Sequence, residues 1–129
     1  MKAHNFTRLE AVDTHQLSHT EKEKLLAIAR ATLAESLEAG TTPTYSPEEP
    51  GLLQEVAAFV TLRRRDGELR GCIGRVEVSQ PLYRTVQECV ISAAVNDFRF
   101  PPVTPAELDD ILIEISALSP FPACVSPRR

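Results

Sequence analysis

Apolar positions in the first third of the chain recur with the period of an amphipathic helix; they are Leu25, Ile28, Ala29, Leu33 and Leu37. Ser18 with Glu21 and Thr20 with Glu23 both have capping-box spacing, and Gly40 is a C-cap candidate. The pattern predicts a helix over residues 20–39 whose apolar side packs into the core. Residues 1–19 lack a comparable pattern, and we expect them to be an N-terminal leader.

The middle of the chain has the pattern of a β-hairpin. Residues 56–62 are a short run rich in β-forming side chains, which predicts a buried strand. Asp66-Gly67 is a turn signal, and the returning strand would run from Leu69 to about Val78. The two strands would pair antiparallel.

A second helix, a short third one and a last strand follow. Ser79 is a candidate N-cap for a helix that ends near Val95, with a buried side made of Leu82, Val86, Cys89, Val90, Ala93 and Ala94. Thr104 and Glu107 have capping-box spacing at the start of a short helix, and residues 112–118 predict a strand. We expect one domain over residues 20–120 and an unstructured tail over 121–129. The fold class is α+β, an antiparallel sheet flanked by helices.

Composition narrows the function classes. The chain has 129 residues, 43% hydrophobic and 25% charged, and a net charge of −4, which argues against a nucleic-acid binder. No apolar run approaches the ~20 residues that span a bilayer, and the start has no signal-peptide core, so we expect a cytoplasmic protein without membrane partners. Three widely spaced cysteines predict neither a disulfide framework nor a metal site.

The stretch Leu69-Arg-Gly-Cys-Ile-Gly74 is the most unusual in the chain. Glycine weakens a strand, so Gly71 and Gly74 around Cys72 need a reason. Backbone or a ligand could approach closely there, or a bulge or positive φ could re-aim Cys72. The plainer alternative is that Cys72 is a buried core residue, because free cysteine behaves as a small hydrophobe.

Charged residues near this stretch suggest an anion site. Residues 63–65 are all arginine, and we interpret them as a solvated hairpin tip. Arg70 is different because it adjoins Gly71, where a ligand could approach, and arginine suits carboxylates and phosphates. Asp97 and Arg99 lie in a proline-stiffened loop and could pair with each other or with Arg70. That loop could be a structural lock or the wall of a site.

The combination of Leu-Arg-Gly-Cys-Ile-Gly at 69–74, Asn-Asp-Phe-Arg-Phe-Pro-Pro at 96–102 and Glu-Ile-Ser-Ala-Leu-Ser-Pro at 114–120 resembles the AMMECR1 domain family, the A component of the AmmeMemoRadiSam system. The resemblance covers about residues 20–120. It implies an α+β fold with a smaller β-containing lobe, and a link to a Memo-type protein and a radical-SAM enzyme. Family domains continue beyond the equivalent of Ser119-Pro120, so we expect this chain to be C-terminally truncated, with uncovered edges that favour association, including a homo-oligomer.

Two functions follow from these residues. The first is a component that binds a partner or a small anionic ligand without a cofactor, through Arg70, Gly71, Gly74, Asn96 and Arg99. The alternative is an enzyme that uses Cys72 as a thiolate nucleophile or redox group, with Asp97 for proton transfer. No histidine follows His19 and no lysine follows Lys24. A Cys–His dyad would therefore need the N-terminal segment, which favours the binding component.

Overall fold

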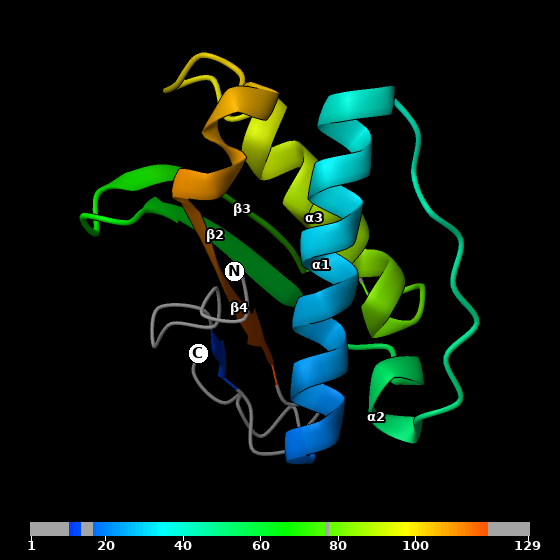
Figure 1. The fold of residues 1–129 in the computed structure, drawn as a ribbon. Helices are drawn as coiled ribbons and strands as arrows, with labels where there is room; N and C mark the ends of the chain where they lie inside the picture. Colours follow the sequence, from blue (N-terminus) through cyan, green and yellow to red (C-terminus); the bar gives the residue numbers. More distant parts are fainter. Residues whose placement is uncertain (1–10, 14–16, 77, 119–129) are drawn as a thin grey trace, which may run out of the picture.

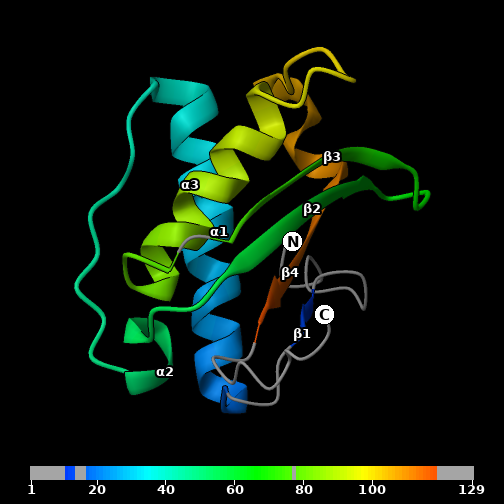
Figure 2. The ribbon, with the colours of Figure 1, turned by 180° about the vertical axis from the view of Figure 1, so that it is seen from behind.

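A computed structural model describes residues 11–13, 17–76 and 78–118 of the chain. Four strands form one sheet in the order β1-β4-β2-β3, and the two long helices, α1 and α3, cover one face of it (Figures 1 and 2). The fold is α+β, as predicted. In chain order the elements are β1 (Ala11–Asp13), α1 (His19–Ala39), α2 (Pro50–Leu53), β2 (Ala58–Arg64), β3 (Leu69–Arg75), α3 (Leu82–Val95), the 3-10 helix η2 (Pro105–Asp110) and β4 (Ile111–Ala117).

The sheet combines a predicted antiparallel part with a strand that the sequence did not predict. β2 pairs antiparallel with both β3 and β4, so the predicted hairpin and last strand are confirmed. β1 adds to β4 in parallel, with Ala11 opposite Glu114 and Asp13 opposite Ser116. A strand of three residues has too little alternation to be recognised, and its pairing partners in the described part of the chain come from β4.

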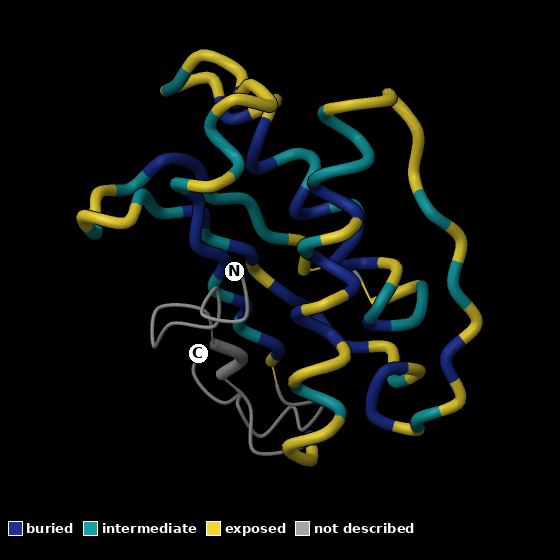
Figure 3. Tube along the Cα trace, in the orientation of Figure 1, coloured by how far each residue is buried: buried dark blue, intermediate teal, exposed yellow. Residues whose placement is uncertain are grey.

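The core lies between the sheet and the two long helices. Alternate side chains of β2 and β4 face the helices and are buried, namely Ala58, Val60, Leu62, Ile113 and Ile115. The predicted apolar side of α3 is buried throughout, and that of α1 is buried except at Leu37, which packs against the core while partly exposed (Figure 3). The two helical periodicities therefore identified the core-facing sides correctly.

The helix ends show which capping signals operate. α1 begins after Ser18, whose hydroxyl accepts from the Glu21 amide at 3.1 Å, while the Glu21 carboxylate accepts from the Ser18 amide at 3.0 Å. Gly40 ends the helix at φ 74°, as expected for a C-cap. α3 begins at Leu82, later than the Ser79 signal predicted, and its first amide donates to the Gln54 carbonyl at 2.7 Å.

Two of the three hairpin arginines, Arg63 and Arg64, form ion pairs that our interpretation of a solvated tip did not include, although both side chains stay partly exposed. Arg65 is exposed at the turn, as that interpretation expects, and its Nε donates to the Asp109 carbonyl at 2.8 Å. Arg63 Nε lies 3.2 Å from a Glu114 oxygen on β4. Arg64 lies within 4 Å of two carboxylates of η2, at 3.8 Å from Glu107 and 3.6 Å from Asp110. The acidic residues of η2 come beside the hairpin only after folding, so local sequence could not show these partners. In the described part of the chain, no helix is long and apolar enough to cross a membrane.

Candidate functional site

Cys72 lies on β3, which ends the strand order on the side away from β1. The Gly71 position faces α3, so Cys72 faces the opposite side, where it pairs with Thr61 of β2 at an Sγ–Oγ1 distance of 3.4 Å. Its amide points away from β2 and donates to Asp97 Oδ2 at 3.0 Å. The side chain is partly exposed, which differs from the buried core cysteine considered above.

Asp97 joins the loop after α3 to β3. Its buried carboxylate accepts from the Cys72 amide and from three nitrogens of Arg99, the amide at 3.1 Å, Nε at 2.9 Å and Nη2 at 2.7 Å. The Arg99 guanidinium is the main cause that holds the pKa of Asp97 well below its usual range, against the opposing effect of burial, with the Arg99 and Cys72 amides adding to it. Asp97 is therefore an ionised acceptor and a weak base at neutral pH.

The same loop presents two side chains outward. The Arg99 side chain is 50% exposed, although one edge of its guanidinium binds Asp97, and it lies 5.4 Å from the centroid of the Phe100 ring. Hydrogen bonds to Asp97 raise the pKa of Arg99. Phe98, next to it, is 96% exposed. Phe98 was not among the residues predicted from the sequence, although its place between Asp97 and Arg99 in a proline-stiffened loop was an available signal.

Arg70 is placed differently from Arg99. It is only 4% exposed and binds both Glu107 oxygens, with Nε at 2.9 Å and Nη2 at 3.1 Å. Its Nη1 donates to the Pro101 carbonyl at 2.9 Å. Hydrogen bonds from Arg70 are the main cause that lowers the pKa of Glu107 to about 2, against the opposing effect of burial. The structure therefore gives Arg70 an internal role, joining β3 to the proline loop and η2.

The two glycines of the motif allow close packing rather than an unusual backbone conformation. A side chain at Gly71 would overlap the Ala93 carbonyl of α3, and one at Gly74 would overlap the Phe59 ring from β2. Among the described residues, positive φ occurs only at Gly40 and Gly67. Both glycines are therefore explained by close approach rather than by a bulge or a positive φ. The groups that approach them are the Ala93 carbonyl and the Phe59 ring, and neither is a ligand.

The remaining candidates either lie outside the described residues or, within them, form no hydrogen bond or ion pair with the Cys72 side chain. Asn96 ends α3, where its amide donates to the Ser92 carbonyl at 2.7 Å. His19 contacts Glu23 at 3.0 Å at the exposed start of α1. Cys89 is fully buried, and burial raises the pKa of its thiol to about 11. His4, His15 and Cys124 lie outside the described residues.

The structure thus brings together Cys72, Asp97 and Arg99, with Phe98 beside them. It places Arg70, Gly71, Gly74 and Asn96 in packing or capping roles around this cluster. Within residues 11–13, 17–76 and 78–118, no group of three or more His, Cys, Asp or Glu residues could hold a metal ion.

Comparisons with known proteins agree with this fold. The AMMECR1 family model matches residues 26–129. A protein of Methanothermobacter thermautotrophicus is 44% identical over 105 residues, covering 81% of this chain and 54% of that protein. Protein MK0488 of Methanopyrus kandleri is 41% identical, with 81% and 52% covered. The crystal structure of uncharacterized protein PH0010 from Pyrococcus horikoshii has a TM-score of 0.71 at 36% identity, covering 76% of this chain and 51% of that one. The chain spans about half the length of these relatives.

Proposed function

The chain belongs to the AMMECR1 family, and we propose that it is a binding component that acts with a Memo-type protein and a radical-SAM enzyme. The observation that carries this proposal is Phe98, an aromatic side chain that is 96% exposed on a loop fixed by hydrogen bonds. Exposed aromatic residues on rigidly held loops are frequent centres of protein–protein binding.

The loop is ordered before a partner binds, because Asp97 forms hydrogen bonds to β3 and to Arg99. One carboxylate holds the Cys72 amide of β3 and the guanidinium of Arg99. Ordering the loop in advance lowers the entropy lost when a partner binds. A partner that fits this surface has an apolar pocket for Phe98 and a carboxylate for the exposed edge of Arg99. The same cation could take the carboxylate or phosphate of a small anionic ligand.

The chemistry around Cys72 also supports binding over catalysis. A cysteine nucleophile of the common type needs a nearby base that removes the thiol proton. Asp97 is the carboxylate placed beside Cys72, but it already accepts four hydrogen bonds and its pKa is far below the usual range. A group with so low a pKa is a weak proton acceptor at neutral pH.

The test is to measure binding of the Memo-type and radical-SAM proteins of the same organism to immobilised chain. Phe98→Ala should weaken binding of at least one of them about tenfold or more, since a truncated aromatic anchor costs a large part of an interface's affinity. Leu53→Ala is the matched control, because Leu53 is 44% exposed on α2, far from the loop in the sequence. The proposal fails if neither protein binds the unaltered chain, or if both variants bind alike.

The partial exposure of Cys72 favours a second candidate function, the enzyme that uses its thiolate. The Arg99 guanidinium lies close enough to interact with a negative charge on the Cys72 sulfur, so it could stabilise a thiolate there. Cys72→Ser separates the two functions. Loss of pathway activity with unchanged partner binding would support the enzyme, and full activity of the variant would exclude it.

A further inference from the structure

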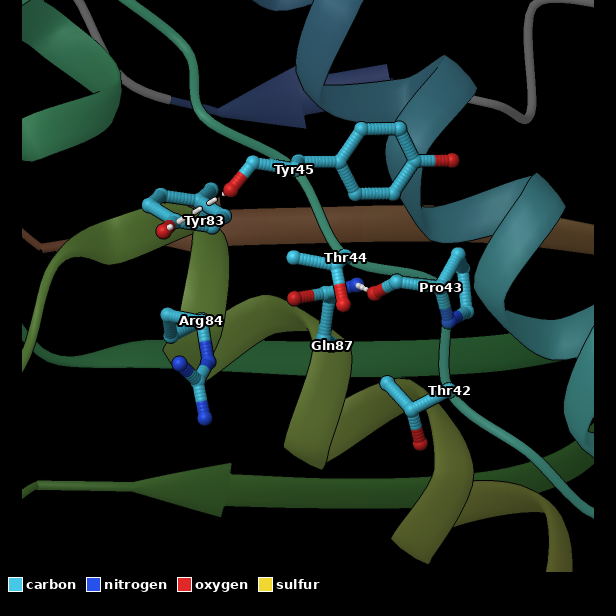
Figure 4. Close-up of a pocket in the computed structure, with 7 residues that line it drawn as sticks. All are labelled: Thr42, Pro43, Thr44, Tyr45, Tyr83, Arg84 and Gln87. Atoms are coloured by element: carbon cyan, nitrogen blue, oxygen red, sulfur yellow. Dashed lines mark hydrogen bonds between the residues drawn. The ribbon is translucent and has the colours of Figure 1, made fainter.

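A pocket of about 170 Å³ lies between the proline-rich loop of residues 41–49 and the first half of α3 (Figure 4). It is lined mainly by polar groups, from Thr42, Pro43, Thr44, Tyr83, Arg84 and Gln87. Tyr83 and Gln87 are near the start of α3, whereas the Phe98 loop follows its other end. The pocket is therefore separate from the proposed partner surface.

Hydrogen bonds between loop and helix keep the pocket formed. The Tyr83 hydroxyl donates to the Tyr45 carbonyl at 3.3 Å. The Gln87 amide nitrogen donates at 3.0 Å both to the Pro43 carbonyl and to the Thr32 hydroxyl of α1. The three prolines of residues 43–50 stiffen the loop. A ligand would therefore find a site that is largely formed before it binds.

Gln87 offers one unused acceptor to this space. The Pro43 carbonyl can only accept, so the amide atom facing it must be nitrogen, and this fixes the orientation of the amide. The Gln87 oxygen then lies on the side away from Pro43 (Figure 4). Gln87 is only 2% exposed, and among the described residues its oxygen has no hydrogen-bond partner. This oxygen is not sealed off from the pocket, so it is available to accept a hydrogen bond from a ligand that enters.

Arg84 supplies a positive charge at the same pocket. It is exposed on α3, and its guanidinium has no ion pair or hydrogen bond with any described residue. The other arginines of the hairpin, β3 and the Phe98 loop bind carboxylates or carbonyl groups, namely Arg63, Arg64, Arg65, Arg70, Arg75 and Arg99. The hydroxyls of Thr42 and Thr44 add groups that can donate or accept.

We propose that this pocket binds a small carboxylate that carries a neighbouring hydrogen-bond donor, the chemistry shared by α-amino and α-hydroxy acids. The carboxylate binds the Arg84 guanidinium, and the neighbouring ammonium or hydroxyl group donates to the Gln87 oxygen. Sites for larger ligands occupy about 300–1,000 Å³, so this pocket suits a small molecule. A phosphate monoester fits poorly, because its dianion has no proton to donate to Gln87.

The test is an NMR titration of the 15N-labelled full chain with L-alanine and with L-lactate. Propionate, which lacks the donor, and ethylamine, which lacks the carboxylate, are matched controls. We expect saturable shifts at the Thr42 and Thr44 amides and at the Gln87 side-chain amide, with a dissociation constant on the order of 1 mM for so small a ligand. Propionate should bind about fivefold more weakly or worse. Absence of saturable shifts with both acids, or equal binding of propionate, overturns the proposal.

Variants of Arg84 test the cation separately. Arg84→Gln should weaken binding of both acids about tenfold or more, and Arg84→Lys should recover part of it. Lys22→Gln removes one positive charge from α1 and is the charge-matched control. Arg84 is exposed, so the spectra of its variants should show the native fold. Unchanged binding in Arg84→Gln overturns the proposal without affecting the Phe98 surface, which is tested with protein partners.

Discussion

Two ion pairs hold the loops around β3, and they differ chiefly in how far the arginine is buried. Arg70 binds Glu107 at 2.9 Å with its side chain 5% exposed. Arg99 binds Asp97 at 2.7 Å with its side chain 50% exposed. Both arginines were candidate binding residues on sequence grounds. The same residue type, close to the same motif, therefore holds the fold together in one place and faces solvent in the other.

The difference follows from what surrounds each guanidinium. The nitrogens of Arg70 bind Glu107 together with the Pro101 and Pro102 carbonyls, so little of its hydrogen-bonding capacity faces outward. One edge of Arg99 binds Asp97, and the rest is accessible. A buried charge that loses its partner costs far more than an exposed one. The two pairs should therefore respond very differently to substitution.

The largest effect is expected from Arg70→Ala. The substitution removes the buried donor that holds the Glu107 carboxylate, which is 22% exposed, and the Pro101 and Pro102 carbonyls. Breaking a buried pair costs about 3–5 kcal/mol, and because Glu107 is partly exposed and keeps its bonds from Thr104, the free energy of unfolding should fall by an amount near the lower end of this range. Urea denaturation followed by circular dichroism measures it.

Arg70→Lys is the control for charge. Lysine keeps the positive charge but loses the planar fork that reaches Glu107 and the carbonyls together. We expect it to be destabilised, though less than Arg70→Ala. If both variants unfold at the wild-type urea concentration, Arg70 does not hold the fold, and the contrast with Arg99 disappears.

The next effect concerns Gly71, which lies directly after Arg70. Alanine there would overlap the backbone carbonyl of Ala93, which cannot move without shifting α3. Forcing an extra methyl group into such a contact costs about 1–3 kcal/mol. The urea midpoint of Gly71→Ala should fall accordingly.

Gly74→Ala is the matched comparison on the same strand. Its new methyl group would meet the Phe59 ring, a side chain that is 38% exposed and can turn away. We therefore expect a smaller loss than for Gly71→Ala. A Gly74 variant that is the less stable of the two would show that the Phe59 ring is held more firmly than the α3 backbone.

Repeating local patterns explain what the sequence predicted of the fold. The periodic apolar positions of α1 and α3 identified both helices and their buried sides. The short run of β-forming residues in β2, the Asp66-Gly67 turn and the pattern around Ile113 identified the three antiparallel strands. The parallel strand β1 was missed because its partners come from the far end of the chain.

The candidate site was harder to predict because its contacts are long-range. Local sequence selected Cys72, Asp97 and Arg99, which the structure does bring together. It could not distinguish Arg70 from Arg99, because the burial of Arg70 depends on Glu107, whose position relative to β3 is a result of folding. Phe98 was missed because local sequence does not show whether an aromatic side chain in a loop is exposed or buried.

Acid should weaken the buried pair. The pKa of Glu107 is about 2 in the folded chain against an ordinary value of 4.5, mainly because of Arg70. Between these values the unfolded chain binds more protons, so the stabilisation is complete above about pH 4.5 and is lost as the pH falls towards 2. The urea midpoint should fall over this range, and the fall should be smaller in Glu107→Gln. The pKa of Asp97 is also lowered, so Asp97 loses stabilisation in acid in the same way and accounts for part of the fall that persists in Glu107→Gln.

The smallest effect on stability is expected from Arg99→Gln. Glutamine removes the charge but can still donate a hydrogen bond to Asp97. The Asp97 carboxylate also still accepts from the Cys72 amide and from the backbone amide of residue 99. Because the Arg99 side chain is half exposed, water replaces much of what is lost, and the urea midpoint should fall less than in Gly71→Ala. The same variant should bind the partner of the Phe98 loop more weakly, because the accessible cation is gone. A loss of stability as large as that of Arg70→Ala, with partner binding unchanged, would mean that Arg99 also serves the fold, and that the exposed half of its side chain takes no part in recognition.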